Sequence, residues 1–155
     1  MVLMGWDKNG GAADFYKNEL EEIKYALKNM GYRMVLEKAS YPTAVSKGRK
    51  LSVSTDWVNM AFGVLPDGYT LQVAAYGADG KRVAAGVSAA VSPAAFSQNG
   101  GDTVTSITEV DTSALAKGTY SLRYAILDTR GQPILLPHQG RAGDGYYRLG
   151  NFTVQ

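Results

Sequence analysis

One alternating segment near the end of the chain limits the folds open to this sequence. In residues 117–128 one face of an extended chain would carry Tyr120, Leu122, Tyr124 and Ile126. The opposite face would carry Ser121, Arg123 and Ala125. A period of two predicts a β-strand with one buried face. Such a strand needs a sheet and a second layer over its apolar side, so the segment predicts an antiparallel β-sandwich.

Further runs of the same kind follow one another from Tyr32 onward. They cover residues 32–37, 50–59, 69–76, 81–88 and 103–110, and a short strand closes the chain. Within 50–59, Trp57 shares a face with Leu51 and Val53, which predicts a core position for its ring. Asp79-Gly80 predicts a hairpin turn. Tyr120 follows Gly118 at a strand start, as does the corner tyrosine of many sandwiches.

One helix is predicted ahead of the strands, over residues 14–30. Its apolar residues recur at steps of four and three: Tyr16, Leu20, Ile23, Leu27 and Met30. Asp14 can cap its N-terminus, and Gly31 is placed to end it. Because the helix is amphipathic, its apolar face must be covered. We expect it to pack on the sandwich or on a neighbouring domain. A helix that binds a separate partner is the alternative.

Size, charge and composition exclude several classes of protein. The 155 residues fit one domain with a short appendage. The net charge is +2 and the charges are scattered, which argues against a nucleic-acid partner. No apolar run approaches the roughly 18 residues of a membrane helix, so no membrane partner is expected. Cysteine is absent, which excludes disulfides and thiolate metal sites. The first six residues lack the basic and apolar regions of a signal peptide.

The order of several short motifs resembles a known family. The motifs are Gly31-Tyr32-Arg33, Val35-Leu36, Tyr41-Pro42, Trp57-Val58-Asn59 with Gly63, Leu115-x-x-Gly118-x-Tyr120-x-Leu122, Gly140-Arg141, Asp144-Gly145-Tyr146-Tyr147 and Leu149-Gly150. They resemble an uncharacterised bacterial family of immunoglobulin-like β-sandwich domains. These domains form the C-terminal part of secreted glycoside-hydrolase-like proteins, behind a (β/α)8 barrel. The resemblance covers roughly residues 14–155.

The resemblance implies an all-β fold, an immunoglobulin-like antiparallel β-sandwich of about seven or more strands with one N-terminal α-helix. Residues 1–31 would be a helical remnant of, or linker from, a preceding domain, and residues 32–155 the sandwich. It also implies an extracellular or cell-surface location and a catalytic domain as partner within a parent protein.

Catalytic residues are not expected in this chain. Asp56 and Glu109 lie in strand patterns, where acids are usually solvated or capping. His138 is the only histidine, and no Gly-x-Ser-x-Gly elbow accompanies it, so a structural or surface role is expected. No cofactor is expected either. A calcium site built on loop oxygens such as Asp102 or Asp144 stays open as an alternative. A hydrolase in its own right is the remotest reading.

Aromatic side chains provide the candidate binding residues. Flat Trp and Tyr rings can cover the apolar face of a pyranose while nearby polar groups hold its hydroxyls. The candidates for surface contact with a polysaccharide or oligosaccharide are Trp6, Tyr76, Phe96, Tyr146 and Tyr147. The predicted function is a non-catalytic carbohydrate-binding or accessory module of a polysaccharide-degrading enzyme. The alternative is a purely structural sandwich that packs on a catalytic barrel, or mediates assembly, without binding sugar.

Overall fold

A computed structural model describes residues 19–87 and 103–155 of the chain. These residues form one helix and eight strands: α2 (Leu20–Asn29), β1 (Met34–Ser40), β2 (Ala44–Val45), β3 (Lys50–Asn59), β4 (Thr70–Tyr76), β5 (Arg82–Val87), β6 (Val104–Asp111), β7 (Gly118–Leu127) and β8 (Tyr147–Val154). Every predicted strand has a counterpart, and only the two-residue β2 was not expected. Five residues with a role predicted from the sequence lie outside the described residues: Trp6, Asp14, Tyr16, Phe96 and Asp102.

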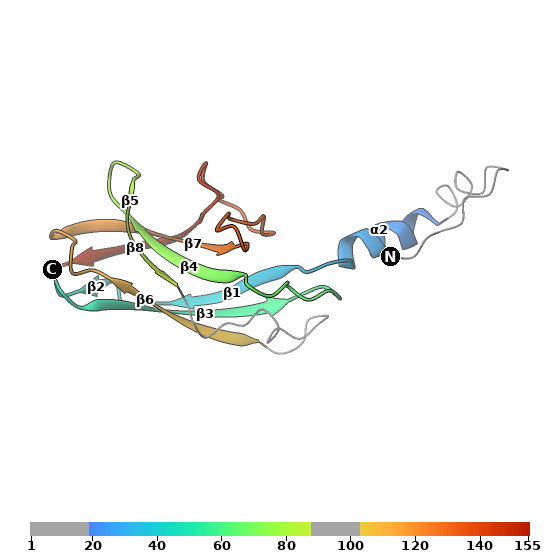
Figure 1. The fold of residues 1–155 in the computed structure, drawn as a ribbon, viewed down its shortest axis with the longest axis horizontal. Coiled ribbons are helices and arrows are strands. Elements are labelled where there is room, and N and C mark those ends of the chain that lie inside the picture. Colours follow the sequence, from blue (N-terminus) through green and yellow to red (C-terminus); the bar gives the residue numbers. More distant parts are fainter. Residues whose placement is uncertain (1–18, 88–102) are drawn as a thin grey trace.

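The strands form two sheets that face each other (Figure 1). One has the order β1-β3-β6, and the other has the order β2-β8-β7-β4-β5. All pairs are antiparallel except β2 with β8, which run parallel. In immunoglobulin nomenclature β1-β3-β6 corresponds to A-B-E, and β8-β7-β4-β5 to G-F-C-C′. The predicted immunoglobulin-like all-β sandwich is therefore confirmed.

The core lies between the sheets and follows the period-two pattern. In β3, Leu51, Val53 and Trp57 are fully buried, as predicted. The opposite sheet contributes Leu122 and Tyr124 of β7, and the Trp57 and Tyr124 rings meet edge to face at 5.7 Å between centroids. Burying large apolar side chains of this kind is the main favourable contribution to folding.

The corner tyrosine is confirmed. The Tyr120 hydroxyl donates a hydrogen bond of 2.8 Å to the carbonyl oxygen of Ala116, four residues upstream. Its ring stacks on Phe152 of β8 with the centroids 5.7 Å apart. The side chain thus fixes the turn that enters β7 and ties it to the neighbouring strand.

His138 links the two sheets through both ring nitrogens. The backbone N–H of Leu36 in β1 donates to Nε2 at 3.0 Å, and the Tyr124 hydroxyl of β7 lies 2.9 Å from Nδ1. Because a backbone N–H can only donate, Nε2 must be an acceptor, so the ring is neutral with its proton on Nδ1. Burial lowers the pKa of His138. The predicted structural role of this histidine is therefore supported by its contacts.

Helix α2 ends just before Gly31, as predicted, and its N-terminal part lies beyond the sandwich (Figure 1). Gly31 follows it with φ +77°, a left-handed conformation that suits glycine. The Gly63 N–H donates to the Gly31 carbonyl, and a Cβ on Gly63 would collide with that backbone. On the N-terminal side of Gly31 the helix lies beyond the end of the sandwich (Figure 1). Its Leu20 side chain is 42 % exposed. The sandwich therefore does not cover Leu20, and packing on a neighbouring domain or on a separate partner stays a prediction. The side chains of Tyr16 and Leu27 are not among those described.

Within the described part of the chain, no helix has the length and apolar character needed to cross a membrane.

We predict that Tyr120→Phe lowers the free energy of unfolding by about 1 kcal/mol, because it removes the hydroxyl bond to Ala116 and keeps the stack on Phe152. Tyr120→Ala removes both interactions and should be clearly more destabilising. Urea denaturation of the three proteins measures the difference. Equal stability of the wild type and Tyr120→Phe would show that the corner hydrogen bond contributes nothing.

We also predict that acid weakens the fold through His138. Its pKa is lower in the folded chain than the ordinary value of 6.5, so the unfolded chain takes up the proton first as pH falls. Stability should therefore be complete above about pH 6.5 and decline as pH falls toward the folded pKa. Denaturant unfolding between about pH 5 and pH 7.5 measures this slope. His138→Asn should lack it, and an identical slope in the variant would contradict the assignment.

Candidate functional site

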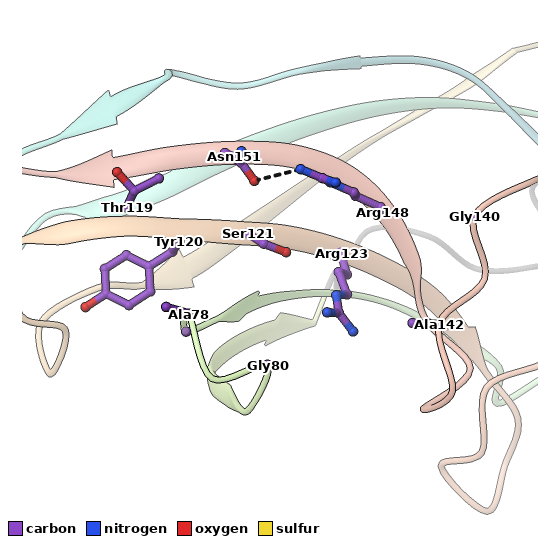
Figure 2. A pocket seen from close by; sticks show the side chains of 11 residues that line it. Ala78, Gly80, Thr119, Tyr120, Ser121, Arg123, Gly140, Ala142, Arg148 and Asn151 are labelled. Carbon is purple, nitrogen blue, oxygen red and sulfur yellow. Dashed lines mark hydrogen bonds between the residues drawn. The ribbon is translucent and has the colours of Figure 1, made fainter.

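The outer face of the five-stranded sheet carries an open cleft of about 450 Å³ (Figure 2). Strand β7 lies along its middle, with β8 on one side and the β4–β5 turn on the other. We call it the arginine cleft; it is lined by Gly77, Ala78, Gly80, Thr119, Tyr120, Ser121, Arg123, Gly140, Ala142, Arg148 and Asn151. Its volume lies within the range of small-molecule sites, roughly 300–1,000 Å³.

The β4–β5 turn forms one wall of the cleft and is the predicted Asp79-Gly80 hairpin. The Gly77 N–H donates to the Lys81 carbonyl at 2.9 Å, and the Gly80 N–H donates to the Gly77 carbonyl at 3.0 Å. Gly80 has φ +76°, which the turn requires and glycine adopts readily. The hairpin prediction is confirmed.

A β-bulge in β8 gathers the polar side chains of the cleft. Leu122 of β7 faces Gly150, but the next residue, Arg123, faces Arg148, so Leu149 is an extra residue in β8. In a regular strand, side chains three residues apart point to opposite faces. The bulge instead allows Arg148 and Asn151 to line the same cleft.

Arg123 and Arg148 are direct cross-strand neighbours on the same face of the sheet. Side chains so placed have their Cβ atoms about 4.5–5.5 Å apart, and like charges there are destabilising. Arg123 is held by other groups: its guanidinium lies 4.1 Å from the Tyr76 ring centroid and 3.5 Å from the Asp144 carboxylate. Arg148 reaches only Asn151, at 3.5 Å, and forms no ion pair within residues 19–87 and 103–155. Its donors are thus available to a ligand.

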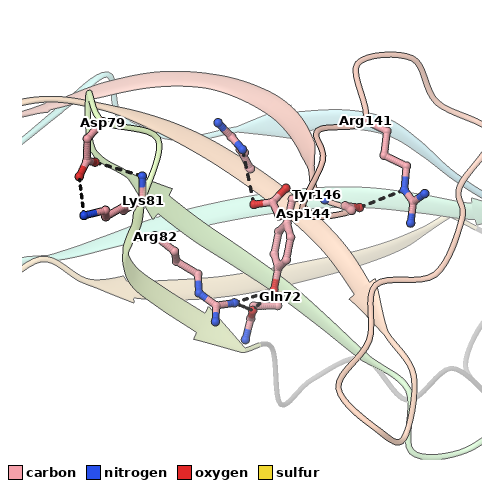
Figure 3. Close-up of polar contacts among 9 residues, drawn as sticks. Gln72, Asp79, Lys81, Arg82, Arg141, Asp144 and Tyr146 are labelled. Atoms are coloured by element: carbon pink, nitrogen blue, oxygen red, sulfur yellow. Dashed lines mark hydrogen bonds and ion pairs between the residues drawn. The ribbon is translucent and has the colours of Figure 1, made fainter.

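A second hollow of about 400 Å³ adjoins the first across Gly80. We call it the tyrosine hollow; it is lined by Tyr76, Gly80, Arg82, Gly131, Pro133, Asp144 and Tyr146. Arg82 donates to the Tyr146 oxygen at 3.0 Å and to Gln72 at 3.2 Å, and the Tyr146 hydroxyl also contacts Gln72 (Figure 3). These groups satisfy one another, so the hollow offers fewer free donors than the arginine cleft.

Ionisation in this region keeps Asp144 charged and the tyrosines neutral. Burial alone would raise the pKa of Asp144, but the Tyr76 hydroxyl, the Tyr146 N–H and the Arg123 guanidinium together hold it below its usual value. Burial, followed by the hydrogen bond to Asp144, raises the pKa of Tyr76 far above its ordinary value. Burial also raises the pKa of Tyr146. Asp144 is therefore a carboxylate that compensates Arg123.

The structure buries the aromatic candidates that it describes. Tyr147 is fully buried in the core, while Tyr76 and Tyr146 are 3 % and 4 % exposed on the opposite face of the sheet. The expectation that they offer exposed rings to a glycan is wrong for all three. Tyr146 and Tyr147 do point to opposite faces. The outward rings of Tyr76 and Tyr146 pack edge to face at 6.0 Å, where the β7–β8 connection covers the sheet. Trp6 and Phe96 lie outside the described residues.

The acids considered from the sequence are engaged in surface contacts. Asp56 accepts from the Thr105 hydroxyl at 2.7 Å, and Glu109 pairs with Lys50 at 2.8 Å on the three-stranded sheet. Among the described residues, no group of three or more His, Cys, Asp or Glu side chains could hold a metal ion. Asp144, considered for calcium, faces Arg123, and the calcium question stays a prediction.

The polar residues that line the arginine cleft were not candidates from the sequence. Arg123 lay on the predicted polar face of its strand, which was the only signal available. No signal in the sequence indicated that Arg148 and Asn151 share a face, because a pattern with a period of two assigns them to opposite faces.

Comparisons with known proteins found similar solved structures at low identity. No protein-family model and no curated protein matches the chain. Among solved structures, one similar chain is the CARDB domain of the PF1109 protein from Pyrococcus furiosus, in complex with di-metal ions. It has 12 % identity and a TM-score of 0.43, covering 82 % of this chain and 91 % of that one. Another is AvmM, which catalyses macrocyclization in alchivemycin A biosynthesis, with 13 % identity, a TM-score of 0.35 and coverage of 76 % and 87 %.

We predict that Arg148→Gln raises the free energy of unfolding by about 0.5 kcal/mol at low salt, because it relieves the repulsion with Arg123. The gain should shrink as added salt screens the two charges. Denaturant unfolding at low and at high ionic strength measures both effects. Arg49→Gln removes the same charge at an exposed position that does not line the cleft and serves as the control. Destabilisation by Arg148→Gln would show that Arg148 contributes to the fold instead.

Proposed function

We propose that this chain is a non-catalytic accessory module that binds polysaccharide in the arginine cleft. The observation that carries the proposal is the lining of the cleft. Side-chain hydroxyls, an amide and two guanidiniums line an open depression in the sheet, and Arg148 contacts Asn151 but forms no ion pair among the described residues. An open cleft accepts a chain that extends beyond it on both sides, as a polysaccharide does.

The side chains of the cleft suit sugar chemistry. Ser121, Thr119 and Asn151 can donate to and accept from sugar hydroxyls, and the guanidiniums add fixed donors. Tyr120 lies at one end of the cleft, where its ring stacks on Phe152 and fixes the start of β7. The residues that line the cleft include no carboxylate and no histidine, which supports binding over acid–base catalysis.

The sequence resemblance supports the same reading. The family it resembles is bacterial and forms the C-terminal part of secreted glycoside-hydrolase-like proteins. We therefore propose an extracellular or cell-surface location, with a catalytic domain as the partner within a parent protein. The module would hold the substrate of that domain near its active site.

One further observation favours a second candidate, a structural domain that packs on a neighbouring domain of the parent protein. Exposed apolar side chains gather where α2 leaves the sandwich: Tyr25, Met30, Met60, Phe62, Val64 and Leu135. The Tyr25 and Phe62 rings are 6.4 Å apart, and Met30 and Leu135 line one shallow hollow. Exposed apolar groups gathered in this way are typical of surfaces that another protein part covers.

Affinity electrophoresis against a panel of neutral and acidic polysaccharides tests the proposal. We predict that at least one polysaccharide retards the protein, with a dissociation constant in the micromolar to millimolar range, roughly −8 to −4 kcal/mol. Arg148→Ala should reduce the retardation. Phe62→Ala, on the apolar surface where α2 leaves the sandwich, should not reduce it. If no polysaccharide retards the protein, the binding function fails and the structural role remains. Retardation that is lost in Phe62→Ala alone would move the site to the apolar end.

A further inference from the structure

We infer that the arginine cleft selects acidic glycans and that Arg123 and Arg148 together hold the carboxylate or sulfate group of one sugar unit. This inference rests on the proposed polysaccharide binding and names the class of ligand.

The pairing of the two arginines is the first ground for the inference. They sit directly opposite each other on neighbouring strands, and the β8 bulge is what brings Arg148 into this register. A regular β8 would place Leu149 opposite Arg123 and avoid the repulsion. A like-charge pair weakens a sheet unless a counter-charge lies between its members. A bound anion would supply that counter-charge.

The charge balance of the cleft is the second ground. Two guanidiniums line it, and the residues that line it include no carboxylate. Arg123 has a counter-charge in Asp144, which lies 3.5 Å away outside the lining of the cleft. Arg148 has no ion pair in the described part of the chain, so one positive charge at this place is left uncompensated.

The form of the side chains favours a planar or tetrahedral oxyanion. A guanidinium presents its N–H donors in a fixed fork that matches the oxygens of a carboxylate or a sulfate. Arg123 is already oriented by its position over the Tyr76 ring, so binding would fix few further rotations on that side. Arg148 is exposed and can close on the anion from the neighbouring strand.

The surroundings favour a sugar over a nucleic acid. Nucleic-acid binding usually relies on several phosphate contacts spread over a basic surface. Here the chain has a net charge of only +2, and the other polar side chains that line the cleft, those of Ser121, Thr119 and Asn151 among them, are neutral. Neutral hydroxyl and amide groups around one anionic subsite suit a uronate or a sulfated sugar.

Acidic glycans, two of them compared with their neutral esters, test the inference. The full chain is run in affinity electrophoresis with polygalacturonate, alginate and chondroitin sulfate, and with highly methyl-esterified pectin and the propylene glycol ester of alginate as neutral counterparts. We expect at least one acidic polymer to retard the protein about tenfold more than its ester does. The retardation should weaken as salt is added, because the contact is between exposed charges.

Variants of Arg148 and of a control position test whether the preference for acidic polymers depends on the arginine cleft. Arg148→Gln should abolish the preference for the acidic form, and Arg148→Lys should keep part of it. Arg49→Gln removes the same charge elsewhere and should leave the preference unchanged. Thermal unfolding of each variant confirms that the fold persists.

The outcomes separate the inference from the proposed function. If neutral polymers retard the protein as much as acidic polymers or more, the inference is overturned and the proposed polysaccharide binding remains. Absence of retardation by every polymer overturns both. A preference for acidic polymers that survives Arg148→Gln overturns the assignment to this cleft. Tighter binding of single-stranded DNA than of any acidic glycan, lost in Arg148→Gln, would make nucleic acid the ligand and overturn the inference.

Discussion

The two sheets of this sandwich are joined by a neutral imidazole. His138 accepts the Leu36 N–H from one sheet and contacts the Tyr124 hydroxyl of the other. The chain has no cysteine, so no disulfide can link the sheets as it does in antibody domains. His138 lies in the connection between β7 and β8, which it thereby fixes against the core. The same connection carries Gly140 and Ala142 of the arginine cleft, so the shape of the cleft depends on this link.

The candidate site lies on the outer face of the five-stranded sheet, beside a network of side chains that satisfy one another. This network of hydrogen bonds and ring contacts adjoins the cleft and joins Tyr76, Tyr146, Gln72 and Arg82. Arg123 is anchored to that network through Tyr76 and Asp144. Arg148 stands opposite without such partners. A like-charge pair held in register by a bulge weakens the sheet, and this is why we propose that the arrangement serves ligand binding.

Much of the fold was predictable because it depends on local pattern. Alternation along residues 50–59 placed Trp57 in the core, and Asp79-Gly80 located a hairpin. Tyr120 was recognised as the corner tyrosine from its position after Gly118. The candidate site was not predictable in the same way. Tyr76 and Tyr146 were assigned to the surface, but the two rings pack on each other across 70 positions of sequence, and alternation cannot predict that contact.

The sequence by itself determined the strands, their inward faces and the end of the helix at Gly31, because these follow from periodicity and from the conformational freedom of glycine. Only the tertiary structure decided that Arg148 faces Arg123, since one extra residue in β8 changes the register for every side chain before it. It also decided that His138 joins the sheets, because that link depends on residues 102 positions apart. Contacts of such long range are set by how the sheets pack, which no local pattern contains.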